Sequence, residues 1–395
     1  MKKRIQDMDV RGKKVLLRCD FNVPIKDGKI LDDSKIVASL NTIDYLIKNN
    51  AKIIILSHFG KVKKEEDKVA NTLAPVAAHL QKLVNTKVIF SQQPRNLYLE
   101  AKIESMNPGE IIVLENTRFE DVPDNLESGN DTQLAMYWAS LADIYCLDAF
   151  GSAHRKHAST YGVAKYLPSC IGYLIQKEMD CLDKYVLNPV HPFTIVMGGA
   201  KVEDKVSLIE SLLPKCDNLL LTGGIANSCL VTLGFNVGAS LRTKDPEVLS
   251  RLKQILVQYK DKIMLPVDAI VGRVYNDALI DHVNIDKIEE DDVIFDIGMK
   301  TIEKYREVIN KSQTIFVNGT AGKYEDVRFA TGTRELLNSI ANTKAVKVIG
   351  GGDGVSAAKN FGFENRFTFL STGGGATLEY IIQSGLPAID NIPDE

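Results

Sequence analysis

The stretch Val346-Lys-Val-Ile-Gly-Gly-Gly-Asp353 carries the pattern that decides the fold. Its first four residues form a short, mainly apolar run, which is typical of a strand buried in a parallel sheet. Three glycines and an aspartate come directly after it. Glycine lets backbone N–H groups approach a ligand closely, so this strand end is suited to a phosphate.

The same pattern recurs along the chain. Further short apolar runs begin at Val15, Ile53, Val88, Ile111, Ile144, Ile195, Leu219, Ile294, Ile315 and Phe367. Longer amphipathic stretches separate these runs. One stretch places Ile36, Leu40, Ile43 and Ile47 on a single helix face and ends at Asn49-Asn50. Alternating strand and helix signals predict an α/β architecture with parallel sheets.

The residues directly after these runs differ between the two halves of the chain. Runs of the first half end in a mixed polar set, namely Asp20, Asn22, His58, Arg118 and Arg155. Runs of the second half mostly end in glycines, at Gly198-Gly199, Gly223-Gly224, Gly298, Gly319, Gly350 to Gly352 and Gly373 to Gly375. Taken alone, each of these residues is also explained by a structural role as a turn residue, a helix cap or a solvated surface charge. Open α/β sheets bind ligands beyond the carboxyl ends of their strands, so the sets together predict two unlike edges. One suits a small anion with carboxylate and phosphate groups, and the other suits phosphates and a flat base.

Composition limits the classes of function. The chain has 395 residues, a formal net charge of -3 and 45% hydrophobic residues, which fits two or three globular domains. No apolar stretch is long enough for a membrane span and no secretory signal is visible. The near-neutral charge argues against nucleic-acid or anionic-membrane partners. The cysteines are dispersed without a C-x-x-C pair, which favours reduced thiols and a cytoplasmic location; they are Cys19, Cys146, Cys170, Cys181, Cys216 and Cys229.

Residues 173–187 predict a linking helix, because Ile175, Met179, Leu182 and Val186 share one face. The segment from Asn188 to Pro192 would end it. The generic nucleotide fingerprints are missing. No G-x-x-x-x-G-K-[ST] is present, and no G-x-G-x-x-G follows a strand, so a dehydrogenase is the weaker alternative.

In its short sequence motifs the chain resembles the phosphoglycerate kinase family over essentially its whole length. The matching segments, in the family's order, are 18–24 (RCDFNVP), 57–60 (SHFG), 114–119 (LENTRF), 148–155 (DAFGSAHR), 198–205 (GGAKVEDK), 223–227 (GGIAN), 265–268 (LPVD), 350–353 (GGGD) and 371–376 (STGGGA).

The resemblance implies two doubly wound parallel-sheet, Rossmann-like domains joined by a hinge helix. The expected boundaries are 1–172 for a 3-phosphoglycerate domain, 173–190 for the hinge, 191–378 for a nucleotide domain and 379–395 for a tail that returns to the first domain. The implied reaction is 1,3-bisphosphoglycerate + MgADP ⇌ 3-phosphoglycerate + MgATP in glycolysis, carried out by a cytoplasmic enzyme expected to be a monomer.

The resemblance also implies site residues. Substrate would be bound by Asp20, Phe21, Asn22, Lys35, His58, Phe59, Gly60, Lys61, Arg118 and Arg155. Catalytic contacts to the transferring group would come from Lys35, Lys201, Gly373 and Gly374. The nucleotide would be held by Lys205, Gly298, Glu325, Gly351, Gly352, Asp353 and Gly354, with Mg²⁺ at Asp353.

Several positions depart from the family pattern. Lys35 and Lys61 stand where arginine is usual, Thr320 replaces a proline, Gly354 replaces serine or threonine, and Met299 stands where proline is common. Lys323 and Tyr324 precede Glu325 where the family has valine and phenylalanine. These departures leave open a weakly active or inactive paralog that binds glycerate phosphate or nucleotide.

Overall fold

The computed structural model describes residues 1–274 and 276–395. By internal contacts the chain forms two compact units, Met1–Asp180 with Gly385–Glu395, and Cys181–Ser384. They are called unit 1 and unit 2 and are described separately. In the described part of the chain, no helix has the length and apolar character needed to cross a bilayer.

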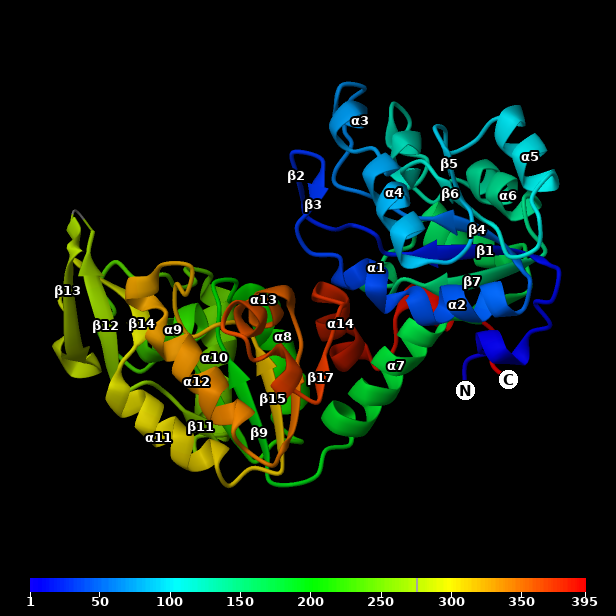
Figure 1. Cartoon of the computed structure of the whole chain (residues 1–395). Helices are drawn as coiled ribbons and strands as arrows, with labels where there is room; N and C mark the ends of the chain where they lie inside the picture. Colours follow the sequence, from blue (N-terminus) through cyan, green and yellow to red (C-terminus); the bar gives the residue numbers. More distant parts are fainter. Residues whose placement is uncertain (275) are drawn as a thin grey trace. The chain divides into compact units, whose positions relative to one another are not determined.

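Unit 1 is built on a six-stranded, fully parallel sheet in the order β5-β6-β4-β1-β7-β8. Its strands are β1 (Lys14–Cys19), β4 (Lys52–Leu56), β5 (Val88–Ser91), β6 (Ile111–Leu114), β7 (Ile144–Asp148) and β8 (Ser169–Ile171). Helices pack on both faces of this sheet (Figure 1), so its central strands are mainly apolar and almost wholly buried. The helices are α1 (Ser34–Ala38), α2 (Leu40–Lys48), α3 (Asp67–Ala70), α4 (Ala74–Leu83), α5 (Leu97–Glu104), α6 (Thr132–Ser140) and the start of α7 (Tyr173–Leu182). A small hairpin joins β2 (Ile25–Lys26) to β3 (Lys29–Ile30).

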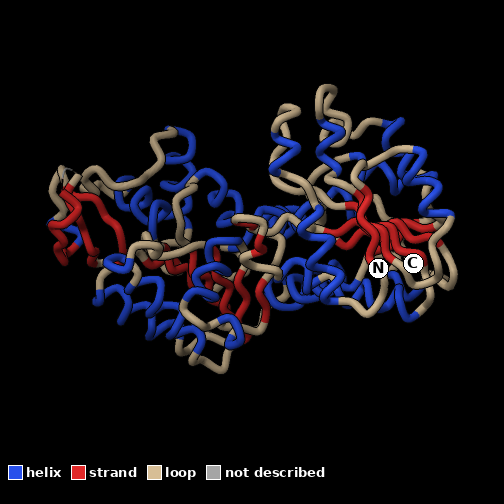
Figure 2. Tube along the Cα trace, turned by 45° about the horizontal axis from the view of Figure 1, so that its top comes forward, coloured by secondary structure: helices blue, strands red, loops and turns tan. Residues whose placement is uncertain are grey.

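Unit 2 contains a second six-stranded parallel sheet, in the order β11-β10-β9-β15-β16-β17. Its strands are β9 (Phe193–Met197), β10 (Asn218–Leu221), β11 (Ile263–Met264), β15 (Thr314–Asn318), β16 (Val346–Ile349) and β17 (Phe369–Leu370). Numbered along the chain, this order is 3-2-1-4-5-6, the arrangement of dinucleotide-binding sheets. The helices are α8 (Glu203–Leu212), α9 (Gly223–Thr232), α10 (Pro246–Gln258), α11 (Met299–Ile309), α12 (Thr331–Ala341), α13 (Gly352–Asn360) and α14 (Gly375–Gln383). Figure 2 shows strands layered between helices in both units.

Two local predictions need correction. The run at Ile294 does not join the parallel sheet of unit 2. It lies in β14 (Asp292–Ile297), which pairs antiparallel with β12 (Asp268–Arg273) in a separate sheet that also contains β13 (Asn276–Asn284). The apolar run alone could not reveal its partner, because antiparallel and parallel strands share this pattern when both faces are covered.

The helix predicted from Ile36 to Ile47 is interrupted. α1 ends and α2 begins at Ser39, whose backbone N–H donates to the carbonyl of Ile36. The Ser39 hydroxyl donates to the carbonyl of Lys35 at 3.4 Å. A side chain that bonds the preceding turn competes with the regular helical pattern, so the chain forms two short helices in place of one.

The linking segment is helical as far as Leu187, with α7 followed by the π-helical turn η6 (Asp183–Leu187). The boundary between the units falls inside α7, after Asp180, and the segment that returns to unit 1 begins at Gly385. This segment includes the short helix α15 (Pro387–Asp390) and is anchored near Ala153, whose carbonyl accepts from the Ala388 N–H at 3.0 Å.

Candidate functional site

The polar residues of unit 1 lie at the carboxyl ends of its parallel strands. Asp20 follows β1, His58 follows β4, and Arg118 lies in the 3₁₀ helix η2 (Thr117–Asp121) after β6. Lys35 of α1 donates to Asp20 Oδ2 at 3.0 Å, and Asn22 Oδ1 accepts from the Gly60 N–H at 3.0 Å. The sheet therefore brings these residues to one edge, as parallel strand topology predicts.

Arg18 is a member of this cluster that the sequence analysis did not assign to the site. It is the last but one residue of β1 and is fully buried. Its Nε donates to Ser159 Oγ at 2.8 Å, and its Nη2 lies 3.2 Å from His58 Nδ1. The sequence did contain a signal for this residue, because an arginine lies inside a mainly apolar run. A buried arginine is rare unless its charge is paired or binds a ligand.

Burial and neighbouring charges set the protonation states of His58 and Asp20 at this edge. Burial lowers the pKa of His58 well below its ordinary value, with Arg18 and Arg118 acting in the same direction. His58 is therefore neutral at pH 7. Burial acts to raise the pKa of Asp20, but Lys35, through its charge and its hydrogen bond, and Arg18 outweigh it and lower the pKa overall, so Asp20 is a carboxylate.

Arg118 has unused hydrogen-bonding capacity. Its Nε is buried and has no hydrogen-bond partner in the described part of the chain. Burial lowers the pKa of Arg118, and the neighbouring Arg155 lowers it further. Asn116 fixes the backbone at Phe59 and Arg118, because its Oδ1 accepts from the N–H groups of both residues at 3.0 Å. A carboxylate or phosphate ligand would satisfy this buried guanidinium donor and neutralise the like charges around it.

A buried carboxylate lies beneath these cations. Glu127 is fully buried and accepts from the Ser159 N–H at 2.9 Å. His157 Nδ1 lies 3.9 Å from Glu127 Oε1. Burial, followed by Arg18, Arg118 and Arg155, lowers the pKa of His157 to about 3. Glu127 and His157 therefore interact electrostatically with Arg18 and Arg118, and the sequence analysis assigned neither to the cluster.

The remaining predicted residues of unit 1 vary in placement. Phe21 and Phe59 are buried and their backbone N–H groups are held by Ser57 Oγ and Asn116 Oδ1. Gly60 has φ +57°, a conformation that glycine adopts without strain. Lys61 is exposed beside it. Arg155 Nε lies 3.2 Å from His154 Nε2, at the same end of the loop after β7.

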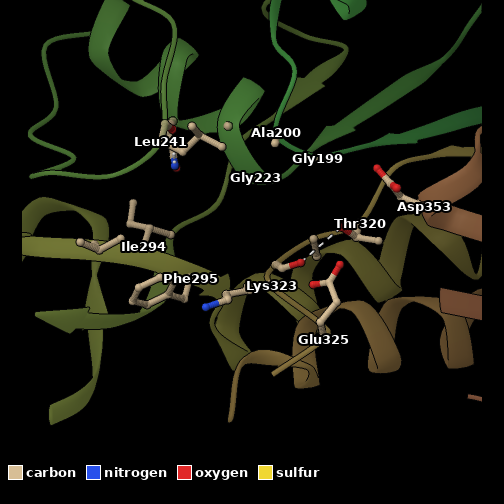
Figure 3. Close-up of a pocket in the computed structure, with 15 residues that line it drawn as sticks. Gly199, Ala200, Gly223, Leu241, Ile294, Phe295, Thr320, Lys323, Glu325 and Asp353 are labelled. Atoms are coloured by element: carbon tan, nitrogen blue, oxygen red, sulfur yellow. Dashed lines mark hydrogen bonds between the residues drawn. The ribbon is translucent and has the colours of Figure 1, made fainter. Parts of the chain in front are cut away.

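Unit 2 contains a cavity of about 360 Å³ at the carboxyl edge of its parallel sheet (Figure 3). It is lined by Gly199, Ala200, Gly223, Gly224, Asn227, Leu241, Val293, Ile294, Phe295, Thr320, Ala321, Gly322, Lys323, Glu325 and Asp353. Leu241, Ile294 and Phe295 form an apolar end, and Asp353 lies at the other end. Such a cavity fits a ligand with a flat apolar part and a charged part.

Lys205 lies behind the charged end of this cavity. Its side chain is buried and its Nζ donates to Asn318 Oδ1. Burial lowers the pKa of Lys205 to about 8, although Asp353 and Asp204 act to raise it. Lys205 therefore carries its charge at pH 7 with little water around it, and it can interact strongly with a phosphate.

Two glycines with positive φ precede helices of unit 2. Gly351, with φ +102°, precedes α13, and Gly374, with φ +56°, precedes α14. Helix N-termini present unpaired N–H groups, and glycine at these positive φ values keeps them accessible. Asp353 and Gly352 lie in the first turn of α13, and Gly373 directly precedes Gly374.

Three predicted residues are not part of the cavity lining. Gly298 is absent from the cavity lining and packs where a Cβ would meet the Asp268 carboxyl at 2.2 Å. Gly354 lies within α13, where a Cβ would meet Ile349 Cγ2 at 2.9 Å. Lys201 is exposed, in the turn before α8. The described residues contain no group of three or more acidic, histidine or cysteine side chains that could hold a metal ion.

Fold and site together define a two-unit α/β protein with a cationic cluster at the strand ends of one parallel sheet and a glycine-lined cavity at the strand ends of the other. Comparisons with known proteins agree. The profile of the phosphoglycerate kinase family matches residues 5–383. The phosphoglycerate kinases of Listeria welshimeri and Enterococcus faecalis are 45% and 44% identical, each over 100% of both chains.

Solved structures give the same result. The phosphoglycerate kinase of Coxiella burnetii superposes with a TM-score of 0.85 at 36% identity, over 99% of this chain and 98% of that one. The enzyme of Pyrococcus horikoshii gives 0.83 at 32% identity over the same shares. This chain belongs to the phosphoglycerate kinase family. It is a glycolytic kinase that transfers a phosphoryl group reversibly from 1,3-bisphosphoglycerate to ADP, giving 3-phosphoglycerate and ATP.

Proposed function

We propose that the cluster of unit 1 holds 3-phosphoglycerate or 1,3-bisphosphoglycerate. Asp20 and Asn22 take the hydroxyl and carboxylate part, with Phe21, Phe59, Gly60 and Lys61 shaping the surrounding loops. His58, Arg118 and Arg155 take the anionic groups. The observation that carries this proposal is the buried Arg118 Nε without a partner in the described part of the chain, set among cations at a parallel-strand edge. Bidentate guanidinium contacts suit both carboxylate and phosphate.

The cavity of unit 2 takes ATP or ADP. The apolar end holds the base, Glu325 binds the ribose, and Lys205 with the glycines before α13 faces the phosphates. Mg²⁺ arrives with the nucleotide and is held at Asp353. A single protein carboxylate fits this ion, because nucleotide-bound Mg²⁺ keeps mostly phosphate and water ligands. When bound, it would neutralise charge on the phosphate oxygens.

Transfer needs the two substrates in line. Lys35, Lys201 and the N–H groups of Gly373 and Gly374 are proposed to stabilise charge on the transferring group. An acyl phosphate has a good leaving group, so no strong general base is required. Because the substrates are proposed to bind to different units, hinge bending would bring the two substrates together and exclude water from the reacting groups. We further propose a monomeric, cytoplasmic enzyme.

Turnover of the purified protein with 3-phosphoglycerate and MgATP tests this function. Coupling the acyl-phosphate product to its reduction gives a continuous readout. We expect turnover on the order of 1–100 per second. Absence of turnover, together with a melting temperature still raised by 3-phosphoglycerate, would contradict it and support a binding paralog.

Lys35 offers a graded test of the catalytic proposal. Lys35→Arg should leave the KM for 3-phosphoglycerate nearly unchanged and raise kcat, because guanidinium supplies the planar fork that an ammonium lacks. Lys35→Met should lower kcat, since it removes the charge that now pairs with Asp20. Steady-state kinetics on both variants measure this. A lower kcat in Lys35→Arg would show that the site has adapted to lysine.

A further inference from the structure

The guanidinium of Arg18 is held in one orientation by three neighbours. Its Nε donates to Ser159 Oγ at 2.8 Å, and its Nη1 donates to the Cys19 carbonyl. Its Nη2 lies 3.2 Å from His58 Nδ1. Arg18 is fully buried, so water does not compete for these donors. Each nitrogen of the planar group has a partner in the protein, and the group cannot turn without breaking one of these contacts.

The hydroxyl of Ser159 connects Arg18 to a buried carboxylate. Ser159 Oγ donates to Glu127 Oε1 at 2.5 Å, and the Ser159 N–H donates to Glu127 Oε2 at 2.9 Å. A serine hydroxyl has a single proton, so donation to Glu127 leaves only lone pairs for the Arg18 Nε–H. Glu127, Ser159 and Arg18 therefore form one directional series of hydrogen bonds, called the Arg18 chain below.

The end of the Arg18 chain determines which ring nitrogen of His58 carries a proton. His58 is neutral at pH 7, because burial lowers its pKa well below the ordinary value. A guanidinium has donors and no acceptor, so His58 Nδ1 accepts from Arg18 and carries no proton. The single proton of the neutral ring is therefore on Nε2. In the described part of the chain the ring makes no further hydrogen bond, which leaves this Nε2–H for a ligand.

The position of this proton matters for an anionic ligand. Carboxylate and phosphate oxygens are mainly hydrogen-bond acceptors, so a protonated ring nitrogen attracts them and a bare ring nitrogen repels them. His58 belongs to the cluster proposed to hold the phosphoglycerate, and Asp20 and Arg118 are among its charged neighbours. The tautomer with Nε2–H is therefore the one that suits the proposed substrate.

We propose that Glu127 is a positioning residue: acting through Ser159 and Arg18, it holds His58 as the tautomer whose Nε2–H donates to the phosphoglycerate. This inference rests on the proposed substrate role of the unit 1 cluster. Glu127, Ser159 and Arg18 are fully buried, so they act on the ligand only through His58.

NMR of protein labelled with ¹⁵N in its histidine rings reports the tautomer directly, because the chemical shift of a ring nitrogen depends on whether it carries a proton. The signals of His58 are assigned by their loss in His58→Gln. In the ligand-free wild type at pH 7 we expect the Nε2–H tautomer. A mixture of both tautomers is expected in Ser159→Ala, which removes the link between Arg18 and Glu127. A smaller change is expected in Glu127→Gln, which keeps one acceptor oxygen and replaces the other with an amide donor.

Steady-state kinetics separate positioning from a purely structural role. Ser159→Ala should raise the KM for 3-phosphoglycerate about tenfold, as expected when one hydrogen bond to a charged ligand is lost, and leave the KM for MgATP unchanged. Ser169→Ala is the matched control, because Ser169 is also a buried serine of unit 1 and its hydroxyl donates to backbone carbonyls. The control should keep both KM values and the tautomer of His58.

Three results would overturn the inference. A proton on Nδ1 of His58 in the wild type would contradict the acceptor role of that nitrogen. An unchanged tautomer in both Ser159→Ala and Glu127→Gln would show that the Arg18 chain does not set it. A changed tautomer with an unchanged KM for 3-phosphoglycerate would show that the Nε2–H does not meet the substrate. The spectra need no ligand, so failure of 3-phosphoglycerate to bind the wild type would be recognised separately, as failure of the proposed function.

Discussion

Arg118→Met should lower kcat/KM for 3-phosphoglycerate by about 100-fold or more, while the variant unfolds at the same or a higher temperature than the wild type. Removing one member of a desolvated charge pair typically costs about 2–5 kcal/mol of binding. The folded protein itself gains nothing from the charge, because burial and the neighbouring Arg155 already lower the pKa of Arg118. The residue is therefore expected to serve the ligand and not the fold.

Steady-state kinetics with saturating MgATP and thermal unfolding with and without 3-phosphoglycerate check this expectation. The stabilisation by 3-phosphoglycerate should be lost with the activity. Arg11→Met is the control, since Arg11 belongs to the same unit, is 77% exposed and pairs with Asp9 at the surface. A strongly destabilised Arg118→Met protein would instead mean that Arg118 has a structural role.

Lys205→Met should lower kcat/KM for MgATP by about 100-fold and leave the KM for 3-phosphoglycerate nearly unchanged. The ammonium of Lys205 is buried behind the charged end of the cavity, where phosphate contacts are little screened by water. Lys253→Met, on the exposed face of α10, is the matched control. Equal losses for both substrates would contradict a role confined to the nucleotide.

The lowered pKa of Lys205 also predicts a pH dependence. Since its pKa is about 8, the wild type should lose kcat/KM for MgATP as the pH rises through 8 and the ammonium loses its proton. Lys205→Arg should move this loss to higher pH, because guanidinium remains protonated there. A pH profile of kcat/KM for 3-phosphoglycerate at saturating MgATP should not show the same step.

Much of the fold could be predicted because each buried parallel strand appears in the sequence as a short, mainly apolar run. Runs such as those at Val15 and Ile315 form the central strands of the two parallel sheets, β1 and β15. Parallel strands end at one edge, so the polar residues that follow β1, β4 and β6 could be grouped from the sequence alone. The run at Ile294 was assigned to the wrong sheet, because an apolar run does not specify its partner and β14 pairs antiparallel with β12.

The α/β class, the family motifs and the charged and glycine-rich strand ends could all be identified from the order of residues along the chain, since these features are local. The contacts of Arg18 with His58, of Glu127 with Arg18 and of Lys323 with Phe295 could be seen only in the folded chain. These contacts join residues far apart in sequence or depend on burial. Burial determines how much free energy it costs to keep a side chain charged. The order of residues along the chain does not show how deeply each one is buried.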